Sequence, residues 1–145
     1  MRKIEKYLML IGIRDMGRPK VVSFDVEGTL ITEDFSEYVW LEAIPQLYAE
    51  AWGMPFQEAK TMVLREYEKI GENRWEWYDI NYWFKHLGLK HNPKTLLEKS
   101  LSHLTYYPEA KEVLEFLHRK GFRLIIISNS AREFLRFQVR DIRKF

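Results

Sequence analysis

The fold of this chain can be inferred from residues 21–30, which read VVSFDVEGTL. An apolar, β-branched run ends at Phe24, the carboxylate of Asp25 follows directly, and Gly28 then interrupts the pattern. This order indicates a buried parallel strand with an acid just beyond its C-terminal end. In open α/β sheets ligands bind at that end of the strands, and a carboxylate there can act as a nucleophile or as a metal ligand.

The same residues resemble the first signature of the haloacid dehalogenase superfamily, usually written D-x-D-G-T. The resemblance implies that Asp25 is the nucleophile and a ligand of Mg²⁺. It implies that Glu27 is the general acid and base through its side chain and a metal ligand through its carbonyl. Enolase-phosphatases of the superfamily also carry Glu at the second place, whereas 2-haloacid dehalogenases carry Tyr, so Glu27 favours a phosphatase. A strand followed by an acidic turn also recurs by chance in other α/β proteins.

A second apolar run covers residues 123–130, which read RLIIISNS, and it predicts a strand covered on both faces of a parallel sheet. Ser128 resembles the second signature of the superfamily, a Ser or Thr that holds a phosphate oxygen, and Thr29 and Asn129 would support the phosphate loop. A hydroxyl and free N–H groups at a strand-to-helix turn suit an anion. The alternative is that Ser128 and Asn129 simply cap the next helix.

The segment before the second run predicts a helix that starts near Pro108 and stops at Gly121. The order of helix, Gly stop, strand and anion turn is the one that the superfamily shows before its second signature. We therefore expect residues 20–25 and 123–128 to form adjacent parallel strands, with Asp25 and Ser128 at the same edge.

The residues between the two signatures predict a helical segment without strand periodicity. Asp34 with Glu37 suggests a capping box, and Gly and Pro residues punctuate the rest. The expected helices cover 34–52, 55–70, 78–87 and 92–104. The position of this insertion resembles the first cap class of the superfamily, which closes over the nucleophile and selects the substrate. The first Arg after the nucleophile is Arg65, whereas the dehalogenases place one earlier, which again favours a phosphatase.

All five Trp residues fall in this insertion. Trp75, Trp77 and Tyr82 crowd a short segment near a helix start, which makes them candidates for a lid over the substrate. For most of the aromatic residues, filling the core of a small helical bundle is the simpler interpretation.

The composition is that of an ordinary globular protein, with 145 residues, 46% hydrophobic and 30% charged, and a net charge of +2. The absence of Cys excludes disulfides, Cys nucleophiles and thiolate metal sites, and the His spacing offers no H-x-x-x-H pair. Both ends are basic, but no Lys/Arg run exceeds two residues, so nucleic acid is not an expected partner. We expect no membrane segment, because no apolar stretch has the length of a span, and a cytoplasmic location.

Two later signatures of the superfamily are not found, namely a Lys and an acidic pair that helps to hold Mg²⁺. Residues 131–145 instead predict a single amphipathic helix. The fold class expected is α/β, a partial Rossmannoid parallel sheet like that of the superfamily, with an inserted four-helix cap. The expected domains are an N-terminal extension (1–17), an incomplete core (18–31 and 106–145) and the cap (32–105).

Three explanations of the incomplete sheet stay open: a truncated gene product, strands from another chain, or an extra strand at 7–13, with Met16 as an alternative start. The function expected is Mg²⁺-dependent hydrolysis of a small phosphorylated metabolite through an aspartyl-phosphate intermediate, by a homo-oligomer. The alternative is a catalytically dead remnant that serves as a binding or oligomerisation module.

Overall fold

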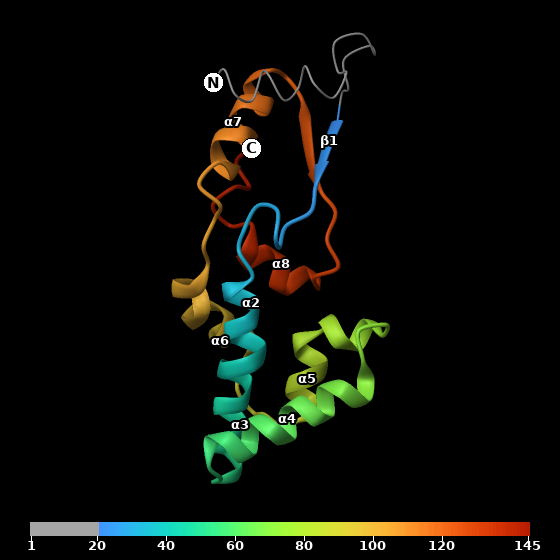
Figure 1. The fold of residues 1–145 in the computed structure, drawn as a ribbon, viewed down its shortest axis with the longest axis vertical. Coiled ribbons are helices and arrows are strands. Elements are labelled where there is room, and N and C mark those ends of the chain that lie inside the picture. Colours follow the sequence, from blue (N-terminus) through green and yellow to red (C-terminus); the bar gives the residue numbers. More distant parts are fainter. Residues whose placement is uncertain (1–20) are drawn as a thin grey trace.

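The structure is a computed structural model that describes residues 21–145. Its sheet consists of β1 (Val21–Phe24) and β2 (Arg123–Ile126), which pair in parallel with Phe24 opposite Ile126 (Figure 1). The predicted pairing of the two apolar runs is therefore confirmed. The expected extra strand at 7–13, the alternative start at Met16 and the N-terminal extension lie outside the described residues.

One face of this sheet packs on a core and the other is open. Phe24 and Leu124 pack on the cluster that includes Leu114 of α7 (Ala110–Arg119). On the opposite face Ile125 is 37% exposed and Ile127, just beyond β2, is 65% exposed. The prediction that β2 is covered on both faces is wrong for the described residues, because the helices that pack near the sheet all lie on the side of Phe24 and Leu124.

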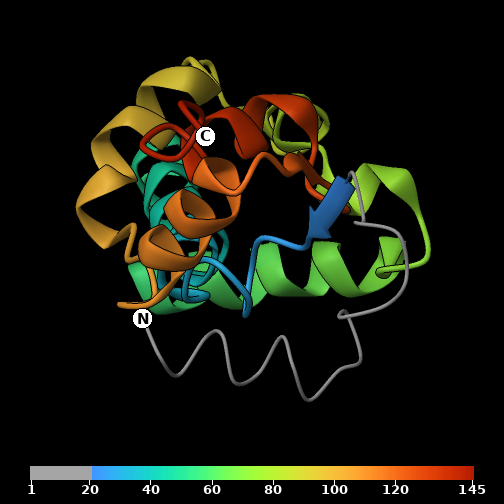
Figure 2. The same ribbon diagram turned by 90° about the horizontal axis from the view of Figure 1, so that it is seen from above.

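The helical insert, residues 32–105 with its helices between Asp34 and His103, joins the two halves of the core and extends away from the sheet (Figures 1 and 2). Four main helical segments were expected there, and the observed helices follow them with small shifts of boundary. The elements are α2 (Asp34–Tyr38), the π-helical turn η1 (Val39–Ala43), α3 (Ile44–Trp52), α4 (Phe56–Ile70), the 3₁₀ turn η2 (Trp75–Tyr78), α5 (Ile80–His86), α6 (Pro93–Lys99) and the 3₁₀ turn η3 (Ser100–His103).

The π-helical turn η1 has a cause in the sequence. Pro45 has no N–H, so the carbonyl of Leu41, four residues earlier, loses its α-helical partner. The N–H of Ile44 bonds instead to the carbonyl of Val39, five residues back. The helix thus continues from α2 into α3 with one wide turn between them rather than with a sharp break.

The start of α2 differs from the expected capping box. Glu33 occupies the N-cap without a side-chain bond to the helix, and Asp34 is the first helical residue. The hydroxyl of Thr32 donates to the Asp34 carboxylate at 2.8 Å, so this carboxylate accepts from a neighbouring side chain instead of capping the N–H groups at the start of the helix. The predicted cap of α6 is confirmed, because the side chain of Asn92 accepts from the N–H of Lys94 at 2.9 Å.

The last helix is shorter than predicted. We expected one helix over 131–145, whereas α8 (Arg132–Gln138) is followed by turns. Phe134 belongs to the core of the helical insert, while Val139 and Ile142 are buried in the core beside the sheet. The chain turns after Gln138 because these apolar residues must reach two different cores.

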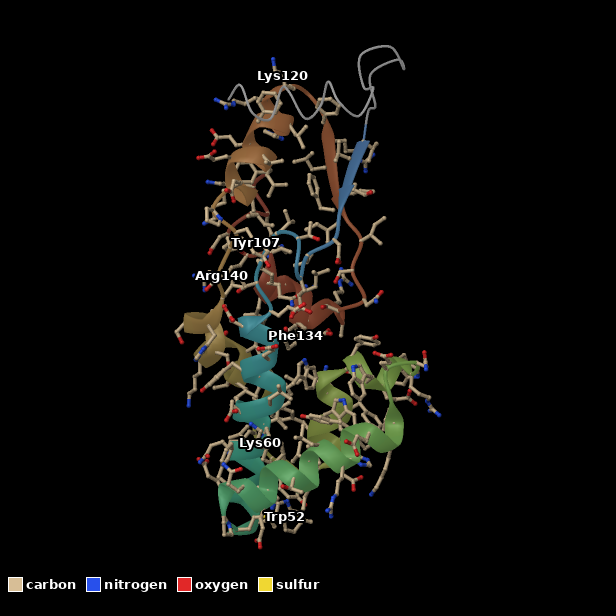
Figure 3. The ribbon with its side chains drawn as sticks, viewed as in Figure 1. Trp52, Lys60, Tyr107, Lys120, Phe134 and Arg140 are labelled. Atoms are coloured by element: carbon tan, nitrogen blue, oxygen red, sulfur yellow. The ribbon has the colours of Figure 1, made fainter. Side chains whose placement is uncertain are left out.

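Phe137 of α8 packs against the core of the helical insert, and Phe134 is buried within it (Figure 3). The ring of Phe134 lies 5.2 Å from that of Phe35 and is stacked at 5.6 Å on that of Trp40, measured between ring centroids. Such aromatic pairs add about 0.5–1.5 kcal/mol to the free energy of burying the rings. Among the described residues, no helix has both the length and the apolar character needed to cross a membrane.

We predict that Phe35→Ala lowers the free energy of unfolding by about 3–5 kcal/mol, because it opens a cavity where the insert meets α8. Phe35 is fully buried, whereas Met62 on α4 is 44% exposed, so Met62→Ala is the control and should change stability by less than about 1 kcal/mol. Urea unfolding followed by circular dichroism measures both. Equal losses in the two variants would contradict this view of the junction.

Candidate functional site

The loop after β1 is a tight turn built around the carbonyl of Val26. This carbonyl accepts from the N–H groups of Leu30 at 2.8 Å and Ile31 at 3.1 Å. Gly28 has a φ of 69°, a left-handed conformation that a residue with a Cβ adopts only with strain. The turn places Glu27 between the sheet and the helical insert, and this is the structural reason for the Gly in the first signature.

The strand pairing continues one residue beyond the sheet. The N–H of Ile127 donates to the carbonyl of Phe24 at 2.9 Å. Asp25 and Ser128 therefore leave two paired strands at the same end of the sheet, as expected for residues that share a ligand. Asp25 is exposed and Ser128 is half-buried.

The segment after β2 is a local turn rather than a helix cap. The hydroxyl of Ser128 accepts from the N–H of Ser130 at 3.1 Å. The N-cap of α8 is Ala131, which has no side-chain bond to the helix, so Ser128 and Asn129 do not cap it. Asn129 is exposed, as is Thr29 in the loop after β1.

Glu27 is held by Gln138, which lies 111 residues further along the chain. The Nε2 of Gln138 donates to the Oε1 of Glu27 at 2.8 Å, and Gln138 is fully buried. The hydroxyl of Tyr106 donates to the backbone carbonyl of Gln138 at 2.8 Å, which fixes the end of α8. The Oε1 of Gln138 is buried without a hydrogen-bond partner among the described residues, so the amide group holds Glu27 through its Nε2 alone.

Burial raises the pKa of Glu27 above its ordinary value, and the nearby carboxylates of Glu33 and Asp25 act in the same direction. The hydroxyl of Ser36 and the amide of Gln138 partly oppose this effect. A raised pKa lets a carboxyl group keep its proton to a higher pH than usual, which suits a group that gives and takes a proton in a reaction.

A cavity of about 500 Å³ lies between the insert and the segment that follows β2. Glu27 and Ser130 line it from the side of the sheet, and Phe134 lines it from α8. The remaining walls come from the helical insert and consist of Glu33, Ser36, Glu37, Trp40, Leu41, Leu64, Tyr67, Glu68, Trp77, Tyr78 and Trp83.

The three lid candidates occupy different places. Trp77 lines this cavity. Trp75 is 68% exposed and lines a second, shallower hollow together with Asn129. The ring centroid of Tyr82 lies 6.4 Å from that of Trp75 and 5.2 Å from that of Trp83, so Tyr82 packs against both of these rings.

Sequence reasoning did not single out Gln138 or Ser36. Neither residue belongs to a motif, and a Gln in an amphipathic helix normally faces water. Gln138 could be recognised only from the three-dimensional structure, because its contact with Glu27 forms when the end of α8 packs beside the loop after β1.

A Mg²⁺ site cannot be assembled from the described residues alone. Among residues 21–145, no group of three or more His, Asp or Glu side chains is close enough to hold a metal ion. Asp25 and the carbonyl of Glu27 are the ligands that the resemblance implies, and they would form only part of an octahedral oxygen site.

The sequence profile of the haloacid dehalogenase-like hydrolases matches residues 19–142. The chain therefore belongs to this family of hydrolases, as the paired strands and the loop after β1 indicated. The match includes both signatures and the whole helical insert.

Two curated relatives, both GMP/IMP nucleotidases YrfG, come from Escherichia coli K12 and Shigella flexneri. Each is 31% identical over 68 residues, and the match covers 47% of this chain but only 30% of the relative. A crystal structure of a HAD phosphatase from Thermococcus onnurineus superposes with a TM-score of 0.69 at 26% identity, over 84% of this chain and 55% of that one. The chain thus spans about half the length of that phosphatase, and its fold is that of the family.

We predict that Glu27→Gln stabilises the fold at neutral pH. The pKa of Glu27 is raised in the folded state, so protonated Glu27 favours folding. This contribution to the unfolding free energy is fully present below the ordinary pKa of 4.5, and it is lost as the pH rises through the folded-state pKa. Gln cannot ionise and still offers an oxygen to Gln138. The variant should therefore exceed the parent in unfolding free energy at pH 7, and the difference should shrink toward pH 4.

Urea unfolding at a series of pH values measures this difference. Glu58→Gln, at an exposed site on α4, is the control and should change the unfolding free energy by about 0.5 kcal/mol or less. A Glu27→Gln variant less stable than the parent at pH 7 would show that the ionised carboxylate is favoured by the fold.

Proposed function

We propose that the chain carries a phosphatase site that hydrolyses phosphate monoesters of small metabolites through an aspartyl-phosphate intermediate. The observation that carries the proposal is the joint position of three groups. Asp25 and Ser128 leave paired strands at one end of the sheet, and the half-buried Glu27, with its raised pKa, lines a cavity in the same region. The names of the relatives, a nucleotidase and a phosphatase, agree with this choice.

In the first step the carboxylate of Asp25 attacks phosphorus, and the bond to the leaving oxygen breaks. Glu27 in its protonated form gives its proton to that oxygen, so the alcohol leaves neutral. In the second step Glu27, now ionised, takes a proton from water as the water attacks the aspartyl-phosphate. Inorganic phosphate leaves, and both carboxyl groups return to their starting states.

The hydroxyl of Ser128 would donate to a phosphate oxygen, and Thr29 and Asn129 would shape the loops around it. Gln138 would keep the carboxyl group of Glu27 directed toward the cavity through the hydrogen bond of 2.8 Å. Dependence on Mg²⁺ would need further ligands beyond Asp25 and the Glu27 carbonyl, because the described residues hold no complete set.

The insert, residues 32–105, would act as a cap over a core made of residues 18–31 and 106–145. The cavity supports this division, because its walls come from both parts. Trp77 would contact the bound substrate, whereas Trp75 and Tyr82 would stiffen the segment that carries it.

We predict that the chain hydrolyses p-nitrophenyl phosphate in the presence of Mg²⁺ slowly, and that Asp25→Asn lowers the rate by about 10³-fold or more, because the amide cannot act as the nucleophile. Ser128→Ala should cost about 10²-fold, as expected for loss of one group that binds developing charge. Asp141→Asn, at an exposed site beyond α8, is the matched control and should be neutral.

Release of p-nitrophenol measures the rates, and a parallel series with EDTA tests the metal requirement. A rate that Asp25→Asn leaves unchanged would exclude Asp25 as the nucleophile and with it this mechanism.

A second candidate function, a binding or oligomerisation module, has an observation in its favour. The sheet face of Val21 leaves three apolar side chains exposed, those of Val21, Ile125 and Ile127, beside Ser23 and Arg123, and exposed apolar side chains favour association. We predict that the chain self-associates and that Ile125→Lys weakens the association by about tenfold or more, since a buried Lys would lose its hydration.

Multi-angle light scattering over a concentration series measures the association. Leu41→Lys, at a similarly exposed apolar site in the insert, is the control. A monomer at all concentrations, with a cooperative unfolding transition, would contradict this candidate.

A further inference from the structure

The charge of the cavity walls is one-sided. Four carboxylates line it, from Glu27, Glu33, Glu37 and Glu68, and no Lys, Arg or His among residues 21–145 does so. Glu27 is half-buried and the other three are exposed, so their mutual repulsion is partly screened by water and salt but still favours a ligand of opposite charge. A ligand that enters this cavity without positive charge would leave that repulsion uncompensated.

The charged groups of the walls are all acceptors, and three of the wall donors, the hydroxyl groups of Ser36 and Tyr67 and the indole N–H of Trp83, already have partners in the fold. The hydroxyl of Tyr67 donates to the carbonyl of Trp40 at 3.2 Å, and the indole N–H of Trp83 donates to the carbonyl of Trp77 at 3.1 Å. Burial raises the pKa of Tyr67 far above its ordinary value, so this hydroxyl keeps its proton. The cavity is therefore matched to a ligand that brings donors or positive charge.

Aromatic rings form the rest of the enclosure. Trp40, Trp77 and Trp83 line the cavity together with two Tyr residues. A cation over the face of a Trp ring is attracted by the ring quadrupole, most strongly where water is excluded. No three acidic side chains among the described residues converge on one point, so the charge suits a diffuse organic cation better than a metal ion.

We propose that this cavity binds an organic ammonium group, and that the substrate is a phosphate monoester of an amino alcohol or its quaternary analogue. The assignment of the substrate rests on the proposed function. Because Glu27 protonates the leaving oxygen and also lines the cavity, the alcohol part of the substrate would lie in the cavity. Binding of the free cation does not depend on catalysis. The cavity of about 500 Å³ has room for such a group and a short carbon chain.

The test compares choline with 3,3-dimethyl-1-butanol, a neutral alcohol of the same shape in which carbon replaces the charged nitrogen. Isothermal titration calorimetry with the full chain should give an affinity for choline at least tenfold higher than for the neutral alcohol. The choline affinity should fall as salt is raised, because the carboxylates near the cavity mouth are partly screened.

Two exposed carboxylates provide variants that leave the catalytic groups untouched. The double variant Glu37→Gln and Glu68→Gln should weaken choline binding by about tenfold, at about threefold for each exposed charge, and should not alter binding of the neutral alcohol. Glu58→Gln, on the same helix as Glu68 but outside the cavity, is the matched control and should bind choline like the parent.

Hydrolysis of phosphocholine is measured beside p-nitrophenyl phosphate, with guanosine as a competing ligand in the titration. Choline binding without hydrolysis of either ester would support the cavity assignment and overturn the phosphatase function. Hydrolysis with equal affinity for choline and the neutral alcohol, or with guanosine bound more tightly than choline, would keep the phosphatase and overturn the cation site.

Discussion

The parallel pairing of β1 with β2 is the contact on which the rest of the molecule depends. It joins Val21 to Arg123 across the whole helical insert, and it sets the end of the sheet from which both signature residues emerge. Without this pairing, the loop after β1 and the segment after β2 would have no fixed position relative to each other. With it, Asp25, Glu27 and Ser128 belong to one region, although no local sequence pattern connects them.

The junction between α8 and the insert depends in turn on that pairing. β2 delivers the chain to α8, where Phe134 packs on Phe35 and Trp40 while Gln138, one turn later, binds Glu27. A buried carboxylate is costly unless it is hydrogen-bonded or neutral, and the amide of Gln138 provides the bond. The raised pKa of Glu27 and the cavity beside it thus have one origin, the docking of α8 against the insert.

Local patterns in the sequence predicted the features that depend on neighbouring residues. The two strands follow from β-branched and aliphatic runs, and the cap of α6 follows from Asn92 and Pro93, which act within one turn. The family signatures indicated Asp25, Glu27 and Ser128, because short motifs keep their spacing.

Features that depend on distant residues could not be predicted in this way. The end of α8 is decided by two separate cores, and the role of Gln138 by a partner 111 residues away. The capping box failed for a local reason instead, because the hydroxyl of Thr32 bonds the Asp34 carboxylate. The open sheet face was missed because an aliphatic strand has the same sequence whether or not a second layer covers it.

The interruption of the core by the insert has a consequence for the order of assembly during synthesis. Within the helical insert, the helices α3 and α4 follow each other in the sequence and pack together, so they can form soon after they emerge from the ribosome, whereas α2 packs on η3 at the other end of the insert. β1 is synthesised before the helices of the insert, but its partner β2 is synthesised after them. β1 therefore stays an unpaired apolar segment until β2 has emerged. Chaperone binding to nascent chains should therefore centre on the first strand, the part of the sheet that is made earliest and completed last.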